Sequence, residues 1–528
     1  MTGEQHTQTV ADHVDTRMTD EKLKPEPQSD ELAAVATRPD TPPLARLESH
    51  VSHHEIQAVA SHASSYIEVN AAQYERFTPV RKHLIVFVLS ICGFLAPVSS
   101  TAVLSAIPEV AQAYNTSGTI INISNAMYLI FMGLSPCFWG PLSQIYGRRW
   151  ICVVSAFLFT IMSIGTALAP NLAAFYIFRM LTAFQGTSFL IVGTSCIGDI
   201  YTPTERGTAL SWFLVGTLVG PCLAPLLGGA IVTYVSWRVI FWMQTGIGAL
   251  ATVLVLLFLP ETIPIKTVDT LNDLTVSKKY ARILHLVSPI RVAHLLVSYP
   301  NLLITGLASS SLVFNMYSLL SPIRYVLNPR FQLTTPMQSG LFFVAPGCGY
   351  LLGTFFGGRA SDAVVKRYIR KRNHRVSEDR LRTVLPFMGI AIPACMLVYG
   401  WSIKYAVGGI PLPVIAMFIQ GVAQLMCFPS LNTYCVDVMQ SKGMSSVVVA
   451  GNYQIRYLFA ALGSAVVLPA VETIGIGWFS TISAGFLVAS TVGVWFVVLH
   501  GQSWRRAVDE RKAQRRAARL EKQNEATR

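Results

Sequence analysis

Two arginines lie inside long apolar stretches of the sequence, where charged side chains are rare. Arg179 belongs to the apolar run 172–197 and Arg456 to the run 446–470. A guanidinium deep in a bilayer costs at least ~2.5 kcal/mol unless it faces a cavity or a partner. Each arginine therefore predicts either a polar site for a substrate or a buried structural arginine bonded to carbonyls.

Polar and aromatic residues in other apolar runs are candidates for the lining of a central cavity. Asn452 precedes Arg456 by four residues, so the two share a helical face. Aromatic residues in core helices mostly serve packing, which leaves Tyr317, Phe343 and Tyr453 as weaker candidates. The predicted substrate-binding or coupling residues are Arg179, Gln185, Asn315, Asn432, Tyr434, Asn452 and Arg456.

Carboxylates are scarce in the apolar runs, and the first run contains none. Asp199 and Asp437 occupy equivalent inner ends of the fourth and tenth runs. A carboxylate at a membrane boundary titrates when it is desolvated, but pairing with nearby Arg206 or Lys442 is the favoured interpretation. The residues themselves therefore mark no obvious proton-carrying acid.

The composition places these residues in an integral membrane protein. Hydrophobic residues make up 52% of the chain and charged residues 13%, against about 25% charged in soluble domains. The net charge of +13 comes from basic residues in loops, which is the positive-inside pattern and argues against nucleic-acid binding. The nine cysteines lack metal-ligand spacing, and no Walker-type phosphate loop or catalytic motif occurs. We expect no cofactor, no metal and no enzymatic activity.

Twelve apolar runs are long enough to cross a bilayer. No Lys or Arg occurs between His83 and Gly147, whereas nine fall between Arg359 and Arg382 and nine more follow His500. Both chain ends are therefore predicted to lie in the cytosol. The predicted runs are 84–106, 118–138, 150–169, 172–197, 207–233, 239–259, 300–322, 337–357, 384–403, 411–432, 446–470 and 476–499.

The runs group into two six-helix bundles with polar segments around them. Residues 1–80 are poor in aromatics and predict a disordered cytoplasmic tail. Residues 81–260 form the first bundle, 261–299 a central cytoplasmic loop that includes an amphipathic stretch, 300–499 the second bundle, and 500–528 a basic cytoplasmic tail.

A short loop motif occurs at matching places in the two halves. Gly140–Arg149 reads GPLSQIYGRR, and Gly358–Arg367 reads GRASDAVVKR. A loop repeated in two hydrophobic halves indicates a duplicated bundle, and such a loop is a candidate gate. The gating residues predicted from these loops are Gly140, Gly147, Arg148, Arg149 and Asp362.

The fifth run carries small residues four apart: Gly216, Gly220, Ala224 and Gly228. Such a stripe lets two transmembrane helices approach closely, while Pro221 and Pro225 bend the helix. The stripe therefore predicts a pivot between the two halves; ordinary tight packing is the other interpretation, and the two are not exclusive.

These motifs resemble the major facilitator superfamily, specifically the fungal twelve-helix drug:proton antiporters, over about residues 80–500. Gly140–Arg149 resembles that family's loop between helices 2 and 3, and Arg179 with Gln185-Gly186 its helix 4 pattern. Gly216–Gly229 and Pro260-Glu261-Thr262 resemble its helix 5 and helix 6 motifs. The resemblance implies an α-helical fold of two six-helix bundles related by a pseudo-twofold axis, and makes Arg179 a proton-coupling or substrate-orienting residue.

One residue departs from the family pattern. The aspartate of the first loop is Gln144 here, although its counterpart Asp362 is retained. A glutamine cannot supply the negative charge that favours a helix N-terminus. The balance between conformational states is therefore expected to differ from that of the family.

Together these features predict a monomeric transporter that exports a small organic molecule by alternating access with proton antiport. Two deep arginines and no central acid favour an organic acid or a neutral metabolite; multidrug efflux of lipophilic or cationic compounds is the alternative, and a non-transporting receptor a distant one. Its partners would be the substrate, protons and the bilayer, in the plasma membrane or the vacuolar membrane. Asn115 begins a glycosylation triplet on a predicted outer loop.

Overall fold

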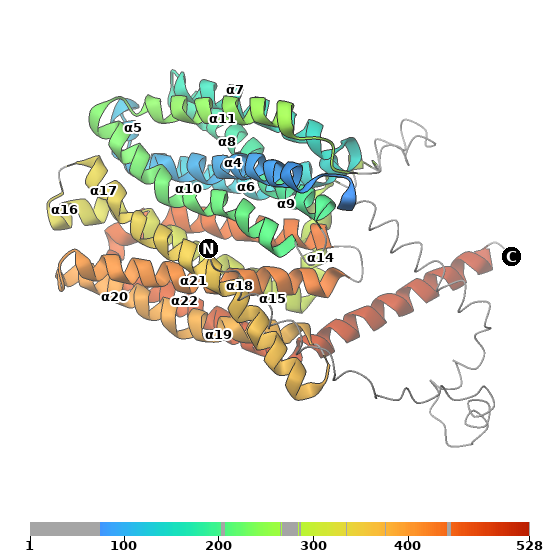
Figure 1. Cartoon of the computed structure of the whole chain (residues 1–528). Coiled ribbons are helices and arrows are strands. Elements are labelled where there is room, and N and C mark those ends of the chain that lie inside the picture. Colours follow the sequence, from blue (N-terminus) through green and yellow to red (C-terminus); the bar gives the residue numbers. More distant parts are fainter. Residues whose placement is uncertain are drawn as a thin grey trace, which may run out of the picture. The chain divides into compact units, whose positions relative to one another are not determined.

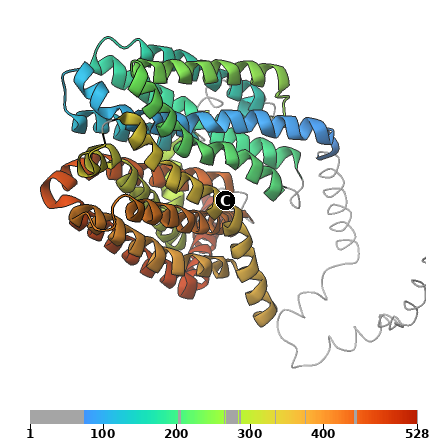
Figure 2. The ribbon, with the colours of Figure 1, turned by 60° about the vertical axis from the view of Figure 1, so that its left-hand side comes forward.

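The computed structural model describes residues 74–201, 206–263, 266, 283–284, 287–333, 335–374, 376–440 and 445–526. Within these residues the regular structure is helical, and two helical groups from the first and second halves of the sequence lie side by side (Figures 1 and 2). Residues 1–73 of the predicted tail 1–80, most of the central loop, Lys442 and the side chain of Arg206 lie outside this description. The last two residues of that predicted tail, Pro79 and Val80, already belong to the first helix.

The first half contains six crossings. Two of them are interrupted: the first becomes a 3-10 helix at Ala102–Ala106, and the fourth breaks at the single turn residue Thr187 between two α-helices. In order, the elements are α4 (Pro79–Thr101), η1 (Ala102–Ala106), α5 (Ile107–Ala113), α6 (Gly118–Tyr146), α7 (Arg148–Ala167), α8 (Leu172–Gly186), α9 (Ser188–Ile200), α10 (Arg206–Tyr234) and α11 (Arg238–Phe258).

The second half contains the remaining crossings. Eleven described helical segments are long and apolar enough to span a membrane, and Gly475, with φ 79°, divides the last of them into two crossings. The elements are α14 (Pro289–Ser298), α15 (Pro300–Leu320), η2 (Ile323–Leu327), α16 (Asn328–Phe331), α17 (Pro336–Phe342), α18 (Val344–Arg372), η3 (Ser377–Thr383), α19 (Val384–Pro386), η4 (Phe387–Ala391), α20 (Ile392–Tyr405), α21 (Pro411–Gln440) and α22 (Ser445–Ala526). The predicted twelve-span architecture is thus confirmed.

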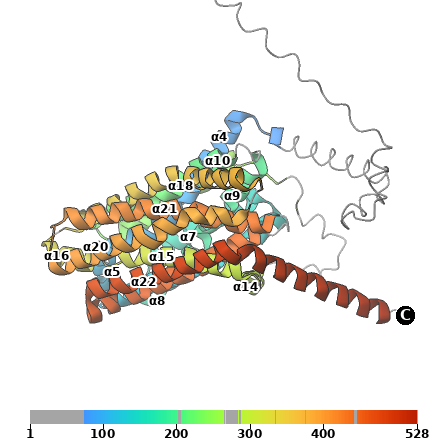
Figure 3. The same ribbon diagram turned by 90° about the horizontal axis from the view of Figure 1, so that it is seen from below.

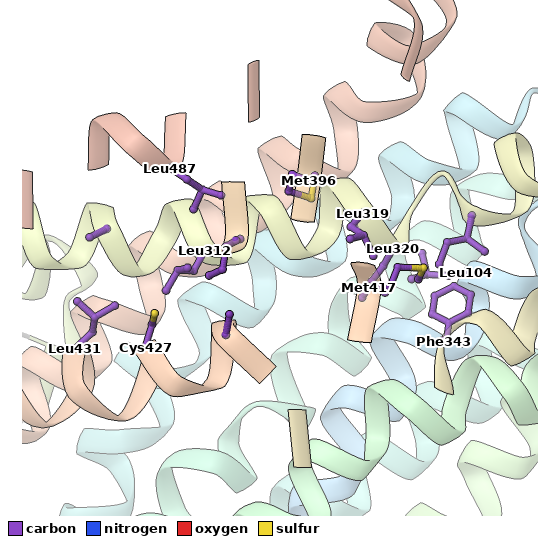
Figure 4. Packing of buried hydrophobic residues seen from close by; sticks show 14 of the residues in the cluster. Leu104, Leu312, Leu319, Leu320, Phe343, Met396, Met417, Cys427, Leu431 and Leu487 are labelled. Atoms are coloured by element: carbon purple, nitrogen blue, oxygen red, sulfur yellow. The ribbon is translucent and has the colours of Figure 1, made fainter. Parts of the chain in front are cut away.

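The largest described hydrophobic cluster lies mainly in the second half and reaches into the first. Leu312, Leu319 and Leu320 of α15 pack with buried side chains of α20, α21 and α22 (Figure 4). Phe343 and Leu104, from different halves, belong to the same cluster. This packing fixes α15 as the centre of the second bundle.

The second loop motif was predicted wrongly. Residues 358–367 lie inside α18, which continues without a break to Arg372 and turns only at Asn373, with φ 58°. In the first motif the chain turns at Gly147, with φ 105° and ψ 152°, a region open essentially only to glycine. The aligned residue in the second motif is Val365, which cannot adopt that conformation and continues the helix.

The small-residue stripe of α10 packs inside its own half, so its predicted place between the halves is wrong. A Cβ at Gly220 would lie 2.6 Å from Cβ of Pro97, and one at Gly228 would lie 2.6 Å from Oγ of Ser105. Gly216 lies equally close to Ser90, so the stripe faces α4 and η1.

A neighbouring face of α10, one residue or about 100° around the helix from the stripe, contacts the second half instead. A Cβ at Gly229 would lie 2.6 Å from the carbonyl oxygen of Pro336, and one at Gly340 would lie 2.9 Å from that of Pro225. The prediction failed because both faces of this helix carry small residues, and spacing does not say which face meets which neighbour.

The last helix extends beyond the bundle. After the twelfth crossing α22 continues as a helix to Ala526, and Figure 3 shows it projecting toward the C-terminus. Its first turns contact the inner end of the second half: Arg505 pairs with Glu378 at 3.2 Å, and Asp509 accepts a hydrogen bond from the Tyr299 hydroxyl at 2.9 Å. Here "inner" denotes the end that carries the basic residues.

Candidate functional site

Arg179 lies on α8 with 2% of its surface exposed. Its Nη2 donates a hydrogen bond to Oδ1 of Asn125 at 3.1 Å, and its guanidinium lies 4.9 Å from the ring centroid of Tyr128. The other two nitrogens, Nε and Nη1, have no hydrogen-bond partner among the described residues. A buried guanidinium with two donor groups to spare fits an anionic or carbonyl oxygen of a ligand.

Arg456 lies on the first crossing of α22 and is more completely bonded. Its Nη2 donates to Oδ1 of Asn432 at 2.6 Å, and its Nε donates to Oγ of Ser309 at 3.1 Å. The rings of Phe428 and Tyr453 lie 4.7 and 5.0 Å from the guanidinium carbon. Four groups from α15, α21 and α22 thus fix this charge.

Asn452 completes the arrangement around Arg456. Its Nδ2 donates to the same Asn432 oxygen at 3.0 Å, while its own Oδ1 is buried without a partner among the described residues. The fold therefore brings together three predicted residues: Asn432, Asn452 and Arg456. The Oδ1 atom of Asn452 remains able to accept a hydrogen bond from a ligand.

Aromatic residues from both halves pack together in one cluster near Arg179. Tyr128 of α6 and Tyr317 of α15 belong to one buried cluster, against which Tyr457 of α22 packs. The Tyr128 hydroxyl is buried without a partner among the described residues. Nothing in the sequence distinguishes Tyr128 or Tyr457 from ordinary packing aromatics, and only the fold places them at the contact between halves.

The other predicted binding residues lie elsewhere. Asn315 donates to Ser483 at 3.1 Å and accepts from Gln420 at 3.1 Å, inside the second half. The Tyr434 hydroxyl accepts from Asn301 at 2.9 Å and lies 3.4 Å from Glu378, near the inner end. Gln185, on α8, is buried, and its Oε1 has no partner among the described residues.

The first predicted gate is a compact charge cluster at the inner end of the first half. Arg148 donates to Oδ2 of Asp199 at 3.2 Å and to Oγ of Ser143 at 2.6 Å. Its backbone N–H donates to Oε1 of Glu261 at 2.8 Å, directly after the turn at Gly147. Asp199 therefore pairs with Arg148, a partner that the sequence analysis did not assign to it.

The remaining residues of the first loop play smaller parts in this cluster. Arg149 donates to the Leu256 carbonyl at 2.9 Å from an exposed position. A Cβ at Gly140 would lie 3.4 Å from Ile191, which is ordinary contact. The contacts of this cluster are thus centred on Arg148 rather than spread over the whole motif.

The second half has a related cluster around a residue that sequence analysis missed. Arg380 donates to Oδ1 of Asp362 at 3.0 Å, and its Nε lies 3.5 Å from Oδ2 of Asp437. The basic pair aligned with Arg148 and Arg149, Lys366 and Arg367, is exposed on α18. The matching positions of Asp199 and Asp437 in the sequence could have indicated Arg380, because a carboxylate at the end of a crossing is stabilised by a basic partner.

The outer ends of the halves are held together by several contacts. Arg324 pairs with Glu109, and this is the one ion pair between the two halves in the described part of the chain. The Thr233 hydroxyl accepts from the backbone N–H of Met337 at 3.1 Å. Asn115 is exposed on the adjoining turn, with φ 49°. The two halves are therefore in direct contact at this end.

Comparison with known proteins agrees with this architecture. The family model described as Major Facilitator Superfamily matches residues 89–464. The MFS antiporter QDR3 of Candida albicans is 24% identical, over 81% of this chain and 79% of its own. The efflux pump radE of Floropilus chiversii is 28% identical, over 79% of this chain and 80% of its own.

Solved structures resemble the chain in fold alone. The human organic anion transporter MFSD10 (TETRAN) superposes with a TM-score of 0.59 at 16% identity, covering 79% of this chain and 100% of that one.

Proposed function

This chain belongs to the major facilitator superfamily, and we propose that it exports a small organic acid or neutral metabolite in exchange for protons. Members of the family are membrane transporters and not enzymes. Similarity to the antiporter QDR3 and the efflux pump radE supports export by antiport. The substrate class rests on the arginines.

The charge distribution in the bilayer supports an anionic or hydrogen-bonding substrate. Arg179 and Arg456 are buried inside their crossings, at least seven residues from the ends, while the carboxylates of Glu109, Asp199 and Asp437 lie within four residues of an end. An empty central site is therefore positively charged, and a bound carboxylate would lower the cost of burying that charge. The two free donors of Arg179 are the single strongest observation for this substrate class.

Alternating access follows from the contacts between the halves. With the outer ends joined by Glu109 and Arg324, substrate would enter from the inner side. Release to the outside requires this pair to separate, while the clusters around Arg148 and Arg380 are the candidate inner gate. In this scheme protons move inward as the substrate moves out. No carboxylate lies deep within the described crossings to carry them, so the proton path would use other groups.

Multidrug efflux is the second candidate. The rings of Tyr128, Phe428 and Tyr453 lie against the two guanidinium groups, and aromatic surfaces also accept lipophilic cations. A cationic substrate would, however, meet two positive charges without a central acid. We therefore place this function behind organic acid export.

Transport by inside-out vesicles under an imposed proton gradient tests the proposal. Labelled benzoate and citrate would be compared with the cationic dye ethidium, using the wild type, Arg456→Gln and the matched control Arg359→Gln, whose arginine is exposed on α18. We expect gradient-driven carboxylate uptake that Arg456→Gln abolishes and Arg359→Gln retains. Uptake of ethidium without carboxylates would establish the multidrug alternative instead.

A further inference from the structure

We propose that Asn125 and Ser464 are positioning residues that aim Arg179 at the substrate and connect its site to the contact between the halves. The inference rests on the proposed function, in which Arg179 binds an anionic group. Asn125 belongs to α6 of the first half, and Ser464 to the first crossing of α22 in the second. Both side chains are almost completely buried, with 1% and 0% of their surface exposed.

The hydrogen bonds run in one direction, starting from the arginine. Arg179 Nη2 donates to Asn125 Oδ1 at 3.1 Å, and Asn125 Nδ2 donates to Ser464 Oγ at 3.2 Å. Ser464 Oγ in turn donates to Asn122 Oδ1 at 3.3 Å, and Asn122 Nδ2 donates to the Ser464 carbonyl. We call these three residues, Asn122, Asn125 and Ser464, the polar joint.

The chemistry of the guanidinium sets every orientation in the joint. An arginine has only donors, so Asn125 must turn its oxygen toward Arg179 and its NH₂ toward Ser464. Ser464 must then accept from Asn125, which leaves its own proton for Asn122. Rotating the Asn125 amide would place two donors against each other, and the joint therefore holds Nη2 in one place.

Holding Nη2 leaves Nε and Nη1 as the groups available for an anion. Tyr128 packs against the guanidinium at 4.9 Å and Phe175 at 5.6 Å, which restricts the arginine further. A pre-oriented guanidinium binds a carboxylate more tightly than a mobile one, because less conformational entropy is lost on binding. The joint therefore acts on affinity for the anionic group.

The same helix carries the second cationic residue. Arg456 and Ser464 are eight residues apart on α22, which corresponds to about 12 Å along the helix axis and about 80° around it. Asn122 and Asn125 lie near the outer start of α6, so the joint must open when the outer ends separate. Opening would release the amide of Asn125 and weaken the hold on Arg179, which favours release of the anion to the outside.

Equilibrium binding and vesicle transport of benzoate and its neutral analogue benzamide test this inference. The variants are Ser464→Ala, Ser464→Thr, Asn125→Leu and, as a matched control, Ser480→Ala at another buried serine of α22. We expect Ser464→Ala and Asn125→Leu to raise KM and Kd for benzoate about three- to tenfold, the contribution of a single hydrogen bond. The maximal rate and the KM for benzamide should stay unchanged, Ser464→Thr should restore benzoate affinity, and Ser480→Ala should match the wild type.

A purely structural role predicts a different pattern. Equal losses for benzoate and benzamide, or a lower maximal rate with unchanged KM, would overturn the inference, as would wild-type benzoate affinity in Ser464→Ala. Arg179→Gln separates the two proposals. If that variant binds benzoate like the wild type, the proposed function of the arginine fails; if it loses benzoate while Ser464→Ala does not, only the polar joint is refuted.

Discussion

At the inner end of each half an arginine neutralises the aspartate that ends the fourth or tenth crossing, but the two arginines come from different places in the sequence. In the first half the side chain of Arg148 is 6% exposed. Its guanidinium pairs with Asp199, and its backbone N–H donates a hydrogen bond to Glu261. In the second half Arg380 faces Asp437 and the largely exposed Asp362, and a second pair, Glu378 with Arg505, lies beside it. Duplication has preserved a buried arginine beside the carboxylate that ends the fourth or tenth crossing. It has not preserved the place of that arginine in the sequence.

The difference follows from where the chain turns. Gly147 ends α6, so the next residue, Arg148, begins α7 beside Asp199. Val365 continues α18 for two more turns, and the base that reaches Asp437 then comes from η3. One glycine position therefore decides which residue of each half becomes the buried arginine.

The largest expected effect comes from removing Arg148. Arg148→Gln would remove the positive charge that lies 3.2 Å from the Asp199 carboxylate, and we expect a loss of about 3 kcal/mol of stability. Arg380→Gln should cost about 1–2 kcal/mol, since Asp362 is 61% exposed and remains solvated. Thermal unfolding of the purified variants in detergent measures both. Equal destabilisation would show that the two clusters are energetically alike.

The tail contact is expected to be the next most sensitive. Glu378 is 2% exposed and pairs with Arg505, so Arg505→Ala leaves a buried carboxylate whose remaining hydrogen-bond partner among the described residues is the Tyr434 hydroxyl. We expect a loss of about 2 kcal/mol. Arg506→Ala, one residue further on, is the control, and Glu378→Gln combined with Arg505→Ala should recover part of the loss. No change in melting temperature for Arg505→Ala would mean that the tail helix does not stabilise the second half.

The turn itself can be tested with alanine. Gly147→Ala forces a side chain into a backbone region reserved for glycine and toward Glu261, so we expect a cost of about 1–3 kcal/mol. Gly358→Ala, in the second motif, replaces a helical glycine whose Cβ would meet nothing within 4 Å. That variant should be neutral or stabilising by up to about 1 kcal/mol. Similar melting temperatures for the two variants would contradict the assigned difference in turns.

The smallest expected effect concerns residue 144. Gln144→Asp restores the acidic residue that position 362 retains, and it would add a carboxylate to the motif whose Arg148 already contacts Asp199 and Glu261. We expect a change of a few tenths of a kcal/mol in stability. A shift in the accessibility of a cysteine introduced at the inner end, read by maleimide labelling, would show that the charge alters the conformational balance. Gln144→Asn supplies the uncharged control.

Features that depend on one helix alone could be predicted from the sequence. The twelve crossings, the buried positions of Arg179 and Arg456, and the closeness of Asn452 to Arg456 follow from hydrophobic runs and helical spacing. Asn315 and Tyr434 were plausible cavity residues by the same criteria. The fold turned them toward Ser483 and Glu378 instead, because the direction of a polar side chain depends on which helix packs beside it.

The sequence by itself determined a membrane-embedded duplicated bundle, since apolar runs of this length must cross a bilayer and basic loops set their direction. It also determined that two arginines would require partners. Only the tertiary structure decided which residues these partners are. Arg179 bonds to Asn125 and, through it, to Ser464, and Arg456 bonds to Asn432 and Ser309. At the inner end Arg148 pairs with Asp199. These contacts join residues far apart in the chain, and their geometry depends on helix packing that no local pattern encodes.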